Sequence, residues 1–468
     1  MAGNNIYGAP CLPIGGDEMM LKGKKISVIG MGKTGIATAE VLAHQNEVTV
    51  FDSKELPIPP QLQGLPLKFH LGDPNYSGAE EADLIVISPG VPRTEPFVSR
   101  ALALNIPIRS EIEIAYRLCK APIIAVTGTD GKSTTVSLIA HILQAGGKKA
   151  ILAGNIGIPF ISIAPSTTPE DIVVLEVSSF QLEWIEEFRP QIGILLNISA
   201  DHLERYNSLE EYALTKMRLF ENQKETDFAI LNRDDPTIHR LAHLVPSTTL
   251  FFSLFPIEEE GIYFDGENIH IKTKKEKLSF PLPTTQLEGR HNVQNMLCAS
   301  LASYLSDINP QTISSALSTF QPLEHRMERI GTLKGALFIN DSKATNPHAT
   351  SKALSSFSSP IILIAGGKIK ENADYESLFK ENVSKLKALI LIGEGRKNLA
   401  EIAEKVGVRN IYSIPNLEEA VKQAVKIASE GDVVLFSPAC SSFDMFANFE
   451  ERGRKFKEIF STLLKEGI

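Results

Sequence analysis

The chain has few cysteines and no long apolar run. Its four cysteines, Cys11, Cys119, Cys298 and Cys440, are scattered and form no CxxC pair. A disulfide framework or a zinc site is therefore not expected, and a reducing compartment fits the composition. No apolar run approaches the roughly 18 residues of a membrane span, and the first residues lack the charged-then-apolar pattern of a signal peptide. We therefore expect a cytoplasmic location without membrane insertion.

The chain also lacks an excess of basic residues. Its 47 Lys and Arg against 56 Asp and Glu give a net charge of −9. This balance argues against a nucleic-acid partner, because a nucleic-acid surface needs clustered positive charge. At 468 residues the chain is too long for a single hydrophobic core, so several domains are expected.

Short apolar strands alternate with helical patterns along most of the chain, which predicts parallel sheets covered by helices. The predicted strands span residues 25–29, 48–51, 84–88, 123–127, 172–177, 192–196, 337–340, 361–365, 389–392 and 433–436. Alternating segments between residues 250 and 280 predict an antiparallel insertion, and helices are predicted over 289–305 and 310–320. The pattern predicts an α/β fold with three domains.

The predicted domain boundaries lie near residues 117 and 322. The first residues are rich in Gly, Pro and Asn, which is typical of a flexible extension. The predicted parts are an extension over 1–20 and domains over 21–117, 118–322 and 323–468.

A glycine-rich turn follows the first predicted strand. Gly30-x-Gly-x-x-Gly35, with Asp52 at the end of the next strand, has the spacing of a dinucleotide-binding fingerprint. Glycines permit close backbone approach and a helix N-terminus attracts pyrophosphate. NAD, FAD and a UDP-sugar all fit such a turn, and a glycine-rich turn without a ligand stays an alternative.

A second glycine-rich loop, Gly128-Thr-Asp-Gly-Lys-Ser-Thr134, follows strand 123–127 and precedes a predicted helix. Its backbone N–H groups can point at phosphate oxygens, Lys132 can neutralise charge on a transferring phosphoryl group, and the Ser133 hydroxyl can reach Mg²⁺. Val126 stands where the first glycine of the common pattern would be, so the loop is a compact variant. It predicts that a nucleoside triphosphate binds here.

Three further residues follow or accompany the central strands. Glu176 ends an apolar strand and is placed to ligate Mg²⁺, although a strand-end acid can also simply face solvent. His202, after strand 192–196, is a candidate metal ligand or substrate contact, with a structural histidine as the alternative. Lys216 lies on a predicted helix over 209–221, where an exposed lysine is the commoner case.

A polar, cationic turn, Asn340-Asp-Ser-Lys-Ala-Thr-Asn346, lies about two hundred residues after the phosphate loop. Asp341 and Lys343 follow strand 337–340, and Thr345 and Asn346 begin the next helix. A helix start beside a lysine is an anion site, although a capped helix with solvated side chains explains the same residues.

Together these motifs resemble the Mur ligase superfamily, from about Leu21 to the C-terminus. The segments that carry the resemblance are Gly154-Asn-Ile-Gly157, Glu176-Val-Ser-Ser-Phe-Gln181, Asp201-His202, Gly289-Arg-His-Asn292, His325-Arg326, Asn340 to Asn346 and Ser437-Pro-Ala-Cys-Ser-Ser442. The phosphate loop is shared by the whole superfamily. The segments at 340–346 and 437–442 are typical of the branch that uses D-glutamate.

The resemblance implies an N-terminal Rossmann-like domain for UDP, a central P-loop ATPase domain and a C-terminal Rossmann-like domain that closes over the site. It implies that ATP converts the carboxylate of UDP-N-acetylmuramoyl-L-alanine to an acyl phosphate, in peptidoglycan precursor synthesis. The amine of D-glutamate then attacks, and a tetrahedral intermediate loses phosphate. Two Mg²⁺ ions and a monomer are implied as well.

The resemblance also implies roles for single residues. Lys132 and Ser133 would hold the triphosphate and the first Mg²⁺, with Glu176 as a further ligand. His202 would serve a second Mg²⁺ or the reacting carboxylate. Lys216 aligns with the lysine that this family carbamylates, which would make it a carboxylate-like metal ligand. Lys343 would stabilise the phosphorylated intermediate.

The remaining implied contacts fall into three groups. The ATP contacts are Gly128, Thr129, Asp130, Gly131, Lys132, Ser133, Thr134, Asn292, Asn295, Arg326 and Asp341. The contacts to the UDP-linked substrate are Gly32, Lys33, Thr34, Asp52, Ser53, Ser88, Gly90 and Asn155. The contacts to D-glutamate are Thr345, Lys370, Ser442 and Phe449.

Two positions depart from the family pattern. Asp130 stands where the phosphate loop usually has Asn, and Lys368 stands where an acidic residue is common. Other hypotheses are a related ligase for another amino acid, as in sister Mur enzymes or folylpolyglutamate synthase, and a non-catalytic nucleotide-binding scaffold. An NAD-dependent oxidoreductase built on Gly30 to Gly35 is a further alternative, which leaves the phosphate loop unexplained.

Overall fold

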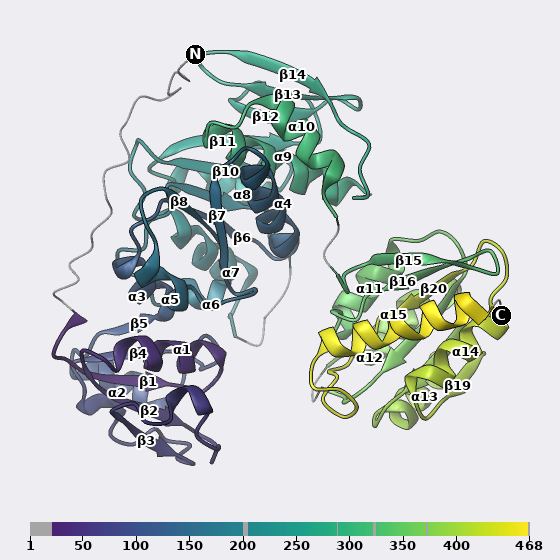
Figure 1. The fold of residues 1–468 in the computed structure, drawn as a ribbon, viewed down its shortest axis with the longest axis horizontal. Helices are drawn as coiled ribbons and strands as arrows, with labels where there is room; N and C mark the ends of the chain where they lie inside the picture. The colour runs from purple at the N-terminus through teal and green to yellow at the C-terminus, as the bar shows by residue number, and fades with distance from the viewer. Residues whose placement is uncertain (1–20, 200–204, 288, 322–323, 371–372, 467–468) are drawn as a thin grey trace. The chain divides into compact units, whose positions relative to one another are not determined.

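The computed structural model describes residues 21–199, 205–287, 289–321, 324–370 and 373–466 (Figure 1). The predicted extension over 1–20 lies outside them. The described strands form three sheets of five, nine and six strands, which confirms the predicted α/β class. Contacts divide the chain into two compact units, residues 1–320 and 321–468. The first unit contains the five- and nine-stranded sheets.

The five-stranded sheet is parallel, with the order β3-β2-β1-β4-β5. Its elements are β1 Lys25–Ile29, α1 Lys33–Leu42, β2 Glu47–Asp52, η2 Pro60–Leu62, β3 Leu67–Leu71, η3 Ala79–Glu81, β4 Leu84–Ile87, α2 Pro96–Ala103 and β5 Ile108–Ser110. Strands β2 and β3 are added on one side of β1, and β4 and β5 on its other side. The turns after β1 and β4 therefore meet at the carboxyl edge. Here the Ser88 hydroxyl donates to the Gly30 carbonyl at 3.3 Å.

The nine-stranded sheet has the order β14-β13-β12-β11-β10-β9-β6-β8-β7. Its strands are β6 Ile123–Thr127, β7 Lys149–Gly154, β8 Asp171–Glu176, β9 Ile192–Leu195, β10 Phe228–Asn232, β11 Thr248–Ser253, β12 Gly261–Phe264, β13 Asn268–Lys272 and β14 Lys277–Pro281. Strand β6 lies between β8 and β9 and is parallel to both. The expected insertion extends this same sheet: β12 is parallel to β11, and β13 is antiparallel to β12 and β14.

The helices of this part are α3 Glu111–Leu118, α4 Lys132–Ala145, α5 Phe160–Ile163, η4 Ala164–Ser166, α6 Ser179–Leu182, α7 Leu209–Met217, η5 Arg218–Phe220, α8 Pro236–Leu241, η6 Ala242–Leu244, α9 Arg290–Leu305 and α10 Pro310–Thr319. Helices α4 and α9 pack together on one face, where Ile139, Leu143 and Leu301 are buried. The helix predicted over 209–221 tightens into η5 after Met217. Arg218 in η5 donates to the carbonyls of segment 182–185, which holds the chain against α6.

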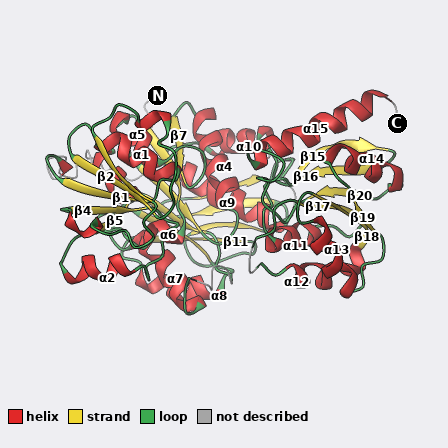
Figure 2. Ribbon diagram, turned by 90° about the horizontal axis from the view of Figure 1, so that it is seen from below, coloured by secondary structure: helices red, strands yellow, loops and turns green. Residues whose placement is uncertain are grey.

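The second unit contains a six-stranded sheet with the order β15-β16-β20-β17-β18-β19. Its elements are β15 Glu328–Leu333, β16 Ala336–Asn340, α11 Pro347–Ser355, β17 Ile361–Gly366, α12 Tyr375–Asn382, η7 Val383–Lys385, β18 Leu386–Ile392, α13 Arg396–Lys405, β19 Ile411–Ser413, α14 Leu417–Ile427, β20 Val433–Phe436 and α15 Phe449–Glu466. Helices α14 and α15 cover one face of this sheet and α11, α12 and α13 the other (Figure 2). Strands β3, β5, β7, β10, β15 and β19 were not predicted, and β15 is antiparallel to β16.

Within the described residues, no helix combines the length and the apolar character needed to cross a membrane. The cysteines that the structure describes, Cys119, Cys298 and Cys440, are buried free thiols.

Candidate active site

The glycine-rich turn after β1 contains glycines that differ in what surrounds them. A Cβ on Gly35 would lie 1.8 Å from the Gly30 carbonyl oxygen, so close packing within the turn requires glycine there. Gly30 has φ +94°, in the left-handed region, and its Cβ would meet Ser88 Oγ at 2.9 Å. A Cβ on Gly32 would meet no atom of the described residues within 4 Å. Close packing within the protein therefore explains why residues 30 and 35 are glycines, whereas Gly32 faces open space.

The other residues predicted around this turn make local contacts. Asp52 accepts from the Met31 N–H at 2.7 Å and from the Lys54 N–H at 3.0 Å, so its carboxylate braces the turn. The Lys33 ammonium donates to the carbonyl of Gly157, in the segment after β7. Ser53 hydrogen-bonds to Tyr76. The turn is thus built from both β1 and β2.

The phosphate loop is held in its shape by glycines and by Asn197. Gly128 and Gly131 have φ of +151° and +83°, and a Cβ on Gly131 would meet Asn295 Oδ1 at 2.5 Å. The Asn197 side chain accepts from the Asp130 N–H at 2.8 Å and donates to the Asp130 carbonyl at 3.1 Å. The Lys132 ammonium donates to the Gly128 and Thr129 carbonyls at 2.9 and 2.8 Å.

Helix α4 starts directly after this loop, with Gly131 as its N-cap residue. Ser133 and Thr134 lie in its first turn and are buried. The free N–H groups of such a helix start attract an anion. The loop, Lys132 and the start of α4 together form a phosphate-binding arrangement.

Glu176 lies beside the phosphate loop, because β8 pairs with β6 in a register that matches Glu176 to Val126. Its Oε1 accepts from the Asn155 amide at 2.9 Å. Its Oε2 is buried and has no hydrogen-bond partner among the described residues. A buried carboxylate oxygen without a partner calls for a cation or a proton. Glu176 therefore fits the role of a Mg²⁺ ligand, and Asn155 orients it.

The described residues contain no group of three or more His, Cys, Asp or Glu side chains that could hold a metal ion. His202, the predicted metal or substrate contact, lies outside the described residues.

Lys216 is buried, with 1% of its surface exposed. The common expectation of a solvated helical lysine is therefore wrong here. Its ammonium donates to the Gly128 carbonyl at 2.9 Å and lies 4.5 Å from the centre of the Tyr212 ring. Lys132 donates to the same carbonyl. The fold thus brings two lysines, far apart in the sequence, to one peptide group of the phosphate loop.

The start of α9 also joins this site. The Asn295 side chain donates to Asn292 Oδ1 at 3.1 Å and accepts from the Thr135 hydroxyl of α4 at 3.2 Å. Both predicted ATP contacts of this helix therefore lie together, and Asn295 reaches the phosphate-loop helix.

In the second unit, Asp341 begins the turn after β16. Its carboxylate accepts from the Ser437 hydroxyl at 2.8 Å and from the Met327 N–H at 3.2 Å. Burial raises the pKa of Asp341 to about 6, against the opposing effect of these hydrogen bonds and of the Arg326 and Lys343 charges. The segments at 340–346 and 437–442 therefore meet at one edge of this sheet.

The residues predicted to contact D-glutamate lie around the same edge. Ser442 is buried, and its carbonyl accepts from the Met445 and Phe446 N–H groups. The carbonyl of Phe449 accepts from the Ser342 hydroxyl at 2.8 Å. Lys370 is exposed at the end of β17, and Thr345 directly precedes the N-cap of α11.

Sequence reasoning missed Arg452, which is fully buried on α15. Its guanidinium donates to the Ser342 hydroxyl and carbonyl at 3.0 and 2.8 Å and to the Cys440 carbonyl at 3.1 Å. Burial lowers its pKa to about 10. Arg452 therefore ties together the two segments of this edge, and no local sequence pattern marked it.

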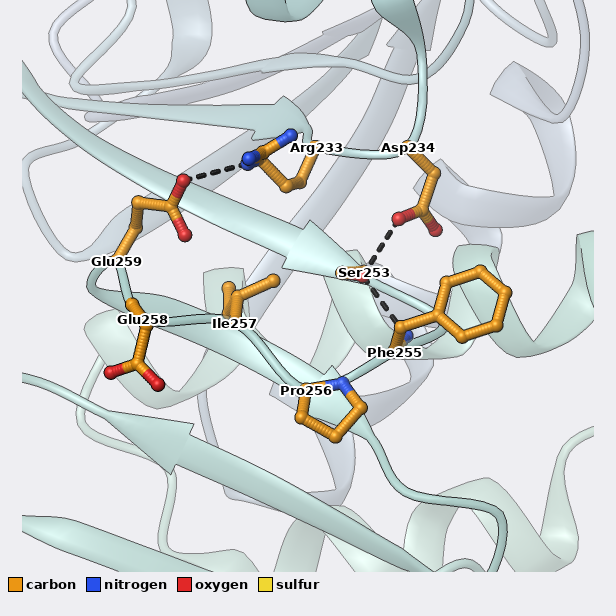
Figure 3. A pocket seen from close by; sticks show the side chains of 8 residues that line it. All are labelled: Arg233, Asp234, Ser253, Phe255, Pro256, Ile257, Glu258 and Glu259. Atoms are coloured by element: carbon orange, nitrogen blue, oxygen red, sulfur yellow. Dashed lines mark hydrogen bonds and ion pairs between the residues drawn. The ribbon is translucent and has the colours of Figure 1, made fainter.

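A surface pocket lies elsewhere, at the ends of β10 and β11 (Figure 3). It is lined by Arg233, Asp234, Ser253, Phe255, Pro256, Ile257, Glu258 and Glu259, a set that includes no predicted site residue. Arg233 pairs with Glu259 at 2.6 Å, and Ser253 donates to Asp234 at 2.7 Å, as Figure 3 shows. These polar groups already satisfy one another, so the pocket is not assigned to the reaction.

Comparison with known proteins decides the family. The model of the Mur ligase middle domain matches residues 126–303, that of the Mur ligase glutamate ligase domain residues 325–440, and that of the MurD-like N-terminal domain residues 24–110. UDP-N-acetylmuramoylalanine--D-glutamate ligase of Thermoanaerobacter sp. (strain X514) is 41% identical over 95% of this chain and 100% of its own length. The chain belongs to the Mur ligase family. The resemblance read from its motifs is thereby confirmed.

Other relatives of this Mur ligase agree. The protein of the same name from Koribacter versatilis (strain Ellin345) is 43% identical over 96% of this chain and 99% of its own. Among solved structures, UDP-N-acetylmuramate-alanine ligase of Thermotoga maritima has a TM-score of 0.55 at 20% identity, covering 94% and 99% of the two chains. The MurF ligase of Thermotoga maritima in complex with ADP has a TM-score of 0.57 at 18% identity, covering 96% of each. These two structures share the fold.

Proposed function

We propose that this chain is an ATP-dependent ligase that adds D-glutamate to UDP-N-acetylmuramoyl-L-alanine in the synthesis of a peptidoglycan precursor. The observation that carries this proposal is the full-length similarity of about 40% to ligases named for that reaction. The geometry at the phosphate loop supports it, because Lys132, Lys216 and Glu176 lie where a triphosphate would bind. ATP is the nucleotide of this family.

The chemistry begins with a poor acylating group, a carboxylate. Transfer of the ATP γ-phosphoryl group makes an acyl phosphate, and the D-glutamate amine then displaces phosphate through a tetrahedral intermediate. Such a reaction needs positioning and charge neutralisation. Lys132 and the N–H groups that start α4 supply positive charge at the phosphates, with Gly128 to Thr134 wrapped around them. Lys343 is proposed to stabilise the phosphorylated intermediate.

We assign Glu176 and Ser133 to a Mg²⁺ site, supported by the buried Oε2 of Glu176, which has no hydrogen-bond partner among the described residues. Mg²⁺ bound here would neutralise phosphate charge. A second Mg²⁺ with His202 as ligand completes the proposed pair. Asn155 holds Glu176 by its amide, and is proposed to contact the UDP-linked substrate from its other side.

Lys216 is proposed to act as a carbamate. A buried ammonium is costly, and a buried lysine reacts more readily in its neutral form. The carbamate nitrogen keeps one N–H, so the hydrogen bond to the Gly128 carbonyl would persist. The modification would replace a cation near the metal site by a carboxylate-like ligand.

The domain boundaries are proposed to lie near residues 117 and 322, as predicted. The binding residues are proposed in three groups. The UDP-linked substrate contacts Gly32, Lys33, Thr34, Asp52, Ser53, Ser88, Gly90 and Asn155. Asn292, Asn295, Arg326 and Asp341 are proposed to contact the adenine, a phosphate or the ribose of ATP, and Thr345, Lys370, Ser442 and Phe449 to contact D-glutamate. The protein is further proposed to be cytoplasmic and monomeric.

The test measures phosphate release from ATP and Mg²⁺ with UDP-N-acetylmuramoyl-L-alanine across a panel of amino acids. We expect release only with D-glutamate, with an amide product of matching mass. Release that did not depend on D-glutamate would contradict the proposed acceptor. Phosphate release supported better by another amino acid would favour a sister ligase activity.

A further inference from the structure

Arg205 makes an unusual set of contacts for a residue outside the predicted site. Its guanidinium binds the Glu183 carboxylate through two hydrogen bonds, at 2.9 and 2.6 Å. The same group donates to the Pro89 carbonyl at 3.0 Å and to the Val91 carbonyl at 3.1 Å. Its flat face lies 4.2 Å from the centre of the Phe180 ring. One side chain therefore connects the nine-stranded part of the unit to the turn after β4.

Glu183 fixes the direction of this guanidinium. Its side chain is fully buried, and besides Arg205 it accepts from the Tyr206 hydroxyl at 2.8 Å and pairs with Arg93 at 3.3 Å. A planar guanidinium bound by both carboxylate oxygens cannot rotate without breaking two charge-assisted hydrogen bonds. Its remaining N–H groups are thereby aimed at the two carbonyls.

The two carbonyls flank Gly90, in the turn that includes Ser88. The Ser88 hydroxyl of this turn donates to the Gly30 carbonyl, which ties the turn to the glycine-rich turn after β1. A Cβ on Gly90 would meet no atom of the described residues within 4 Å. Arg205 therefore holds the backbone on both sides of Gly90, and the space beside Gly90 itself is open.

In the other direction the contacts continue to the phosphate loop. The Tyr206 ring lies 5.2 Å from the Tyr212 ring. Tyr212 in turn lies under the Lys216 ammonium, and its hydroxyl is 3.4 Å from Thr129 Oγ1. A series of contacts thus leads from the backbone of this turn through Arg205, Glu183 and the two tyrosines to the phosphate loop.

We propose that Arg205 is a positioning residue for the UDP-linked substrate. It holds the turn from Ser88 to Val91 in the shape that accepts this substrate. It also joins that turn to the part of the nine-stranded sheet that carries the phosphate loop. The inference rests on the proposed function, which assigns Ser88 and Gly90 to this substrate. If Arg205 had a purely structural role, its substitution would change stability and would change the KM values of all three substrates alike.

The test compares Arg205→Lys with a matched control, Arg93→Lys. A lysine at 205 keeps the charge but cannot bind the carboxylate and both carbonyls at once. Arg93 also binds Glu183, through its carboxylate and its carbonyl, but neither carbonyl of the turn. KM values for UDP-N-acetylmuramoyl-L-alanine, ATP and D-glutamate are measured for each variant, together with kcat and Tm.

We expect Arg205→Lys to raise the KM for the UDP-linked substrate by at least about tenfold, because two hydrogen bonds from a charged donor are lost. The KM values for ATP and D-glutamate should stay within about twofold, and Arg93→Lys should change none of the three beyond that. The rise in Tm caused by UDP-N-acetylmuramoyl-L-alanine should shrink in Arg205→Lys, and the rise caused by ATP should not.

An unchanged KM, or an equal change in all three, would overturn the positioning role. If Arg205→Lys does not fold, Glu183→Gln takes its place, because it leaves Arg205 present but weakens what orients it; the same selective rise is expected and a uniform change overturns the inference. Wild-type protein without D-glutamate-dependent turnover would instead refute the proposed function, so the two failures are distinguishable.

Discussion

The two glycines at the start of α1 allow a sharp test of whether the turn after β1 binds a substrate. Gly32 and Gly35 lie three residues apart, and alanine at each adds one methyl group. At Gly35 the added Cβ would lie 1.8 Å from the Gly30 carbonyl oxygen and 3.0 Å from its carbon. At Gly32 it would meet no described atom within 4 Å. The same added methyl group would therefore meet backbone at Gly35 and open space at Gly32.

Gly35→Ala forces backbone apart, and overpacking of this kind costs about 1–3 kcal/mol or more. Gly32 is the N-cap of α1 with φ −78° and ψ −178°, a conformation that alanine adopts. Alanine is a poorer N-cap than glycine, so we expect Gly32→Ala to cost at most about 1 kcal/mol. Its methyl group would instead occupy the space that a pyrophosphate needs. The expected result is a KM for the UDP-linked substrate raised by about tenfold or more.

Thermal unfolding and steady-state kinetics of the two variants check this. Gly35→Ala should lower Tm by several degrees, whereas Gly32→Ala should change Tm little and change mainly the KM for the UDP-linked substrate. A Gly32→Ala enzyme with a wild-type KM would refute the reasoning that this turn faces the substrate. An unchanged Tm in Gly35→Ala would refute the reasoning from close packing.

Three further predictions concern Lys216, Asp130 and Glu111. Lys216→Ala should lose at least roughly hundredfold in kcat and regain part of it with a short added carboxylate, whereas wild-type activity would exclude a carbamate role. Asp130→Asn should lower the KM for ATP, because a negative charge near the phosphates is removed; an unchanged KM would place the acid away from the nucleotide. Burial raises the pKa of Glu111 from 4.5 to about 7. Its contribution to the free energy of unfolding is therefore complete below pH 4.5 and lost as the pH rises through about 7. Urea unfolding should show that wild type loses about 3 kcal/mol more over this range than Glu111→Gln does, because the other titrating groups are common to both proteins.

Much of the fold could be predicted from local sequence. The strands at 25–29, 123–127 and 433–436 were predicted with the bounds that the structure shows, because they are short apolar runs between clear turn signals. Strand β15 was missed, since Glu328–Leu333 mixes charged residues with glycine and is partly exposed along much of its length. It is a strand because it pairs with β16 at the sheet edge, which is a non-local cause.

The candidate site divides in the same way. The phosphate loop and the turn at 340–346 could be recognised from sequence, because binding by backbone N–H groups demands glycines and polar residues at fixed spacing. The burial of Lys216 could not, since its helix resembles any amphipathic surface helix until the phosphate loop is placed against it. Arg205 and Arg452 share this property. Each donates to two backbone carbonyls that lie 12 or more residues away in the chain, and a carbonyl has no sequence signature.

By itself the sequence determined the class of fold, the family and the positions of the phosphate-binding loops, because these depend on periodicity and on local backbone geometry. Only the tertiary structure decided which charged side chains are buried and what they face. It brought Lys132 and Lys216 to one carbonyl, gave one oxygen of Glu176 no hydrogen-bond partner within the described part of the chain, and aimed Arg205 at the turn around Gly90. The physical reason is that the cost of burying a charge depends on partners that the chain supplies only when it is folded.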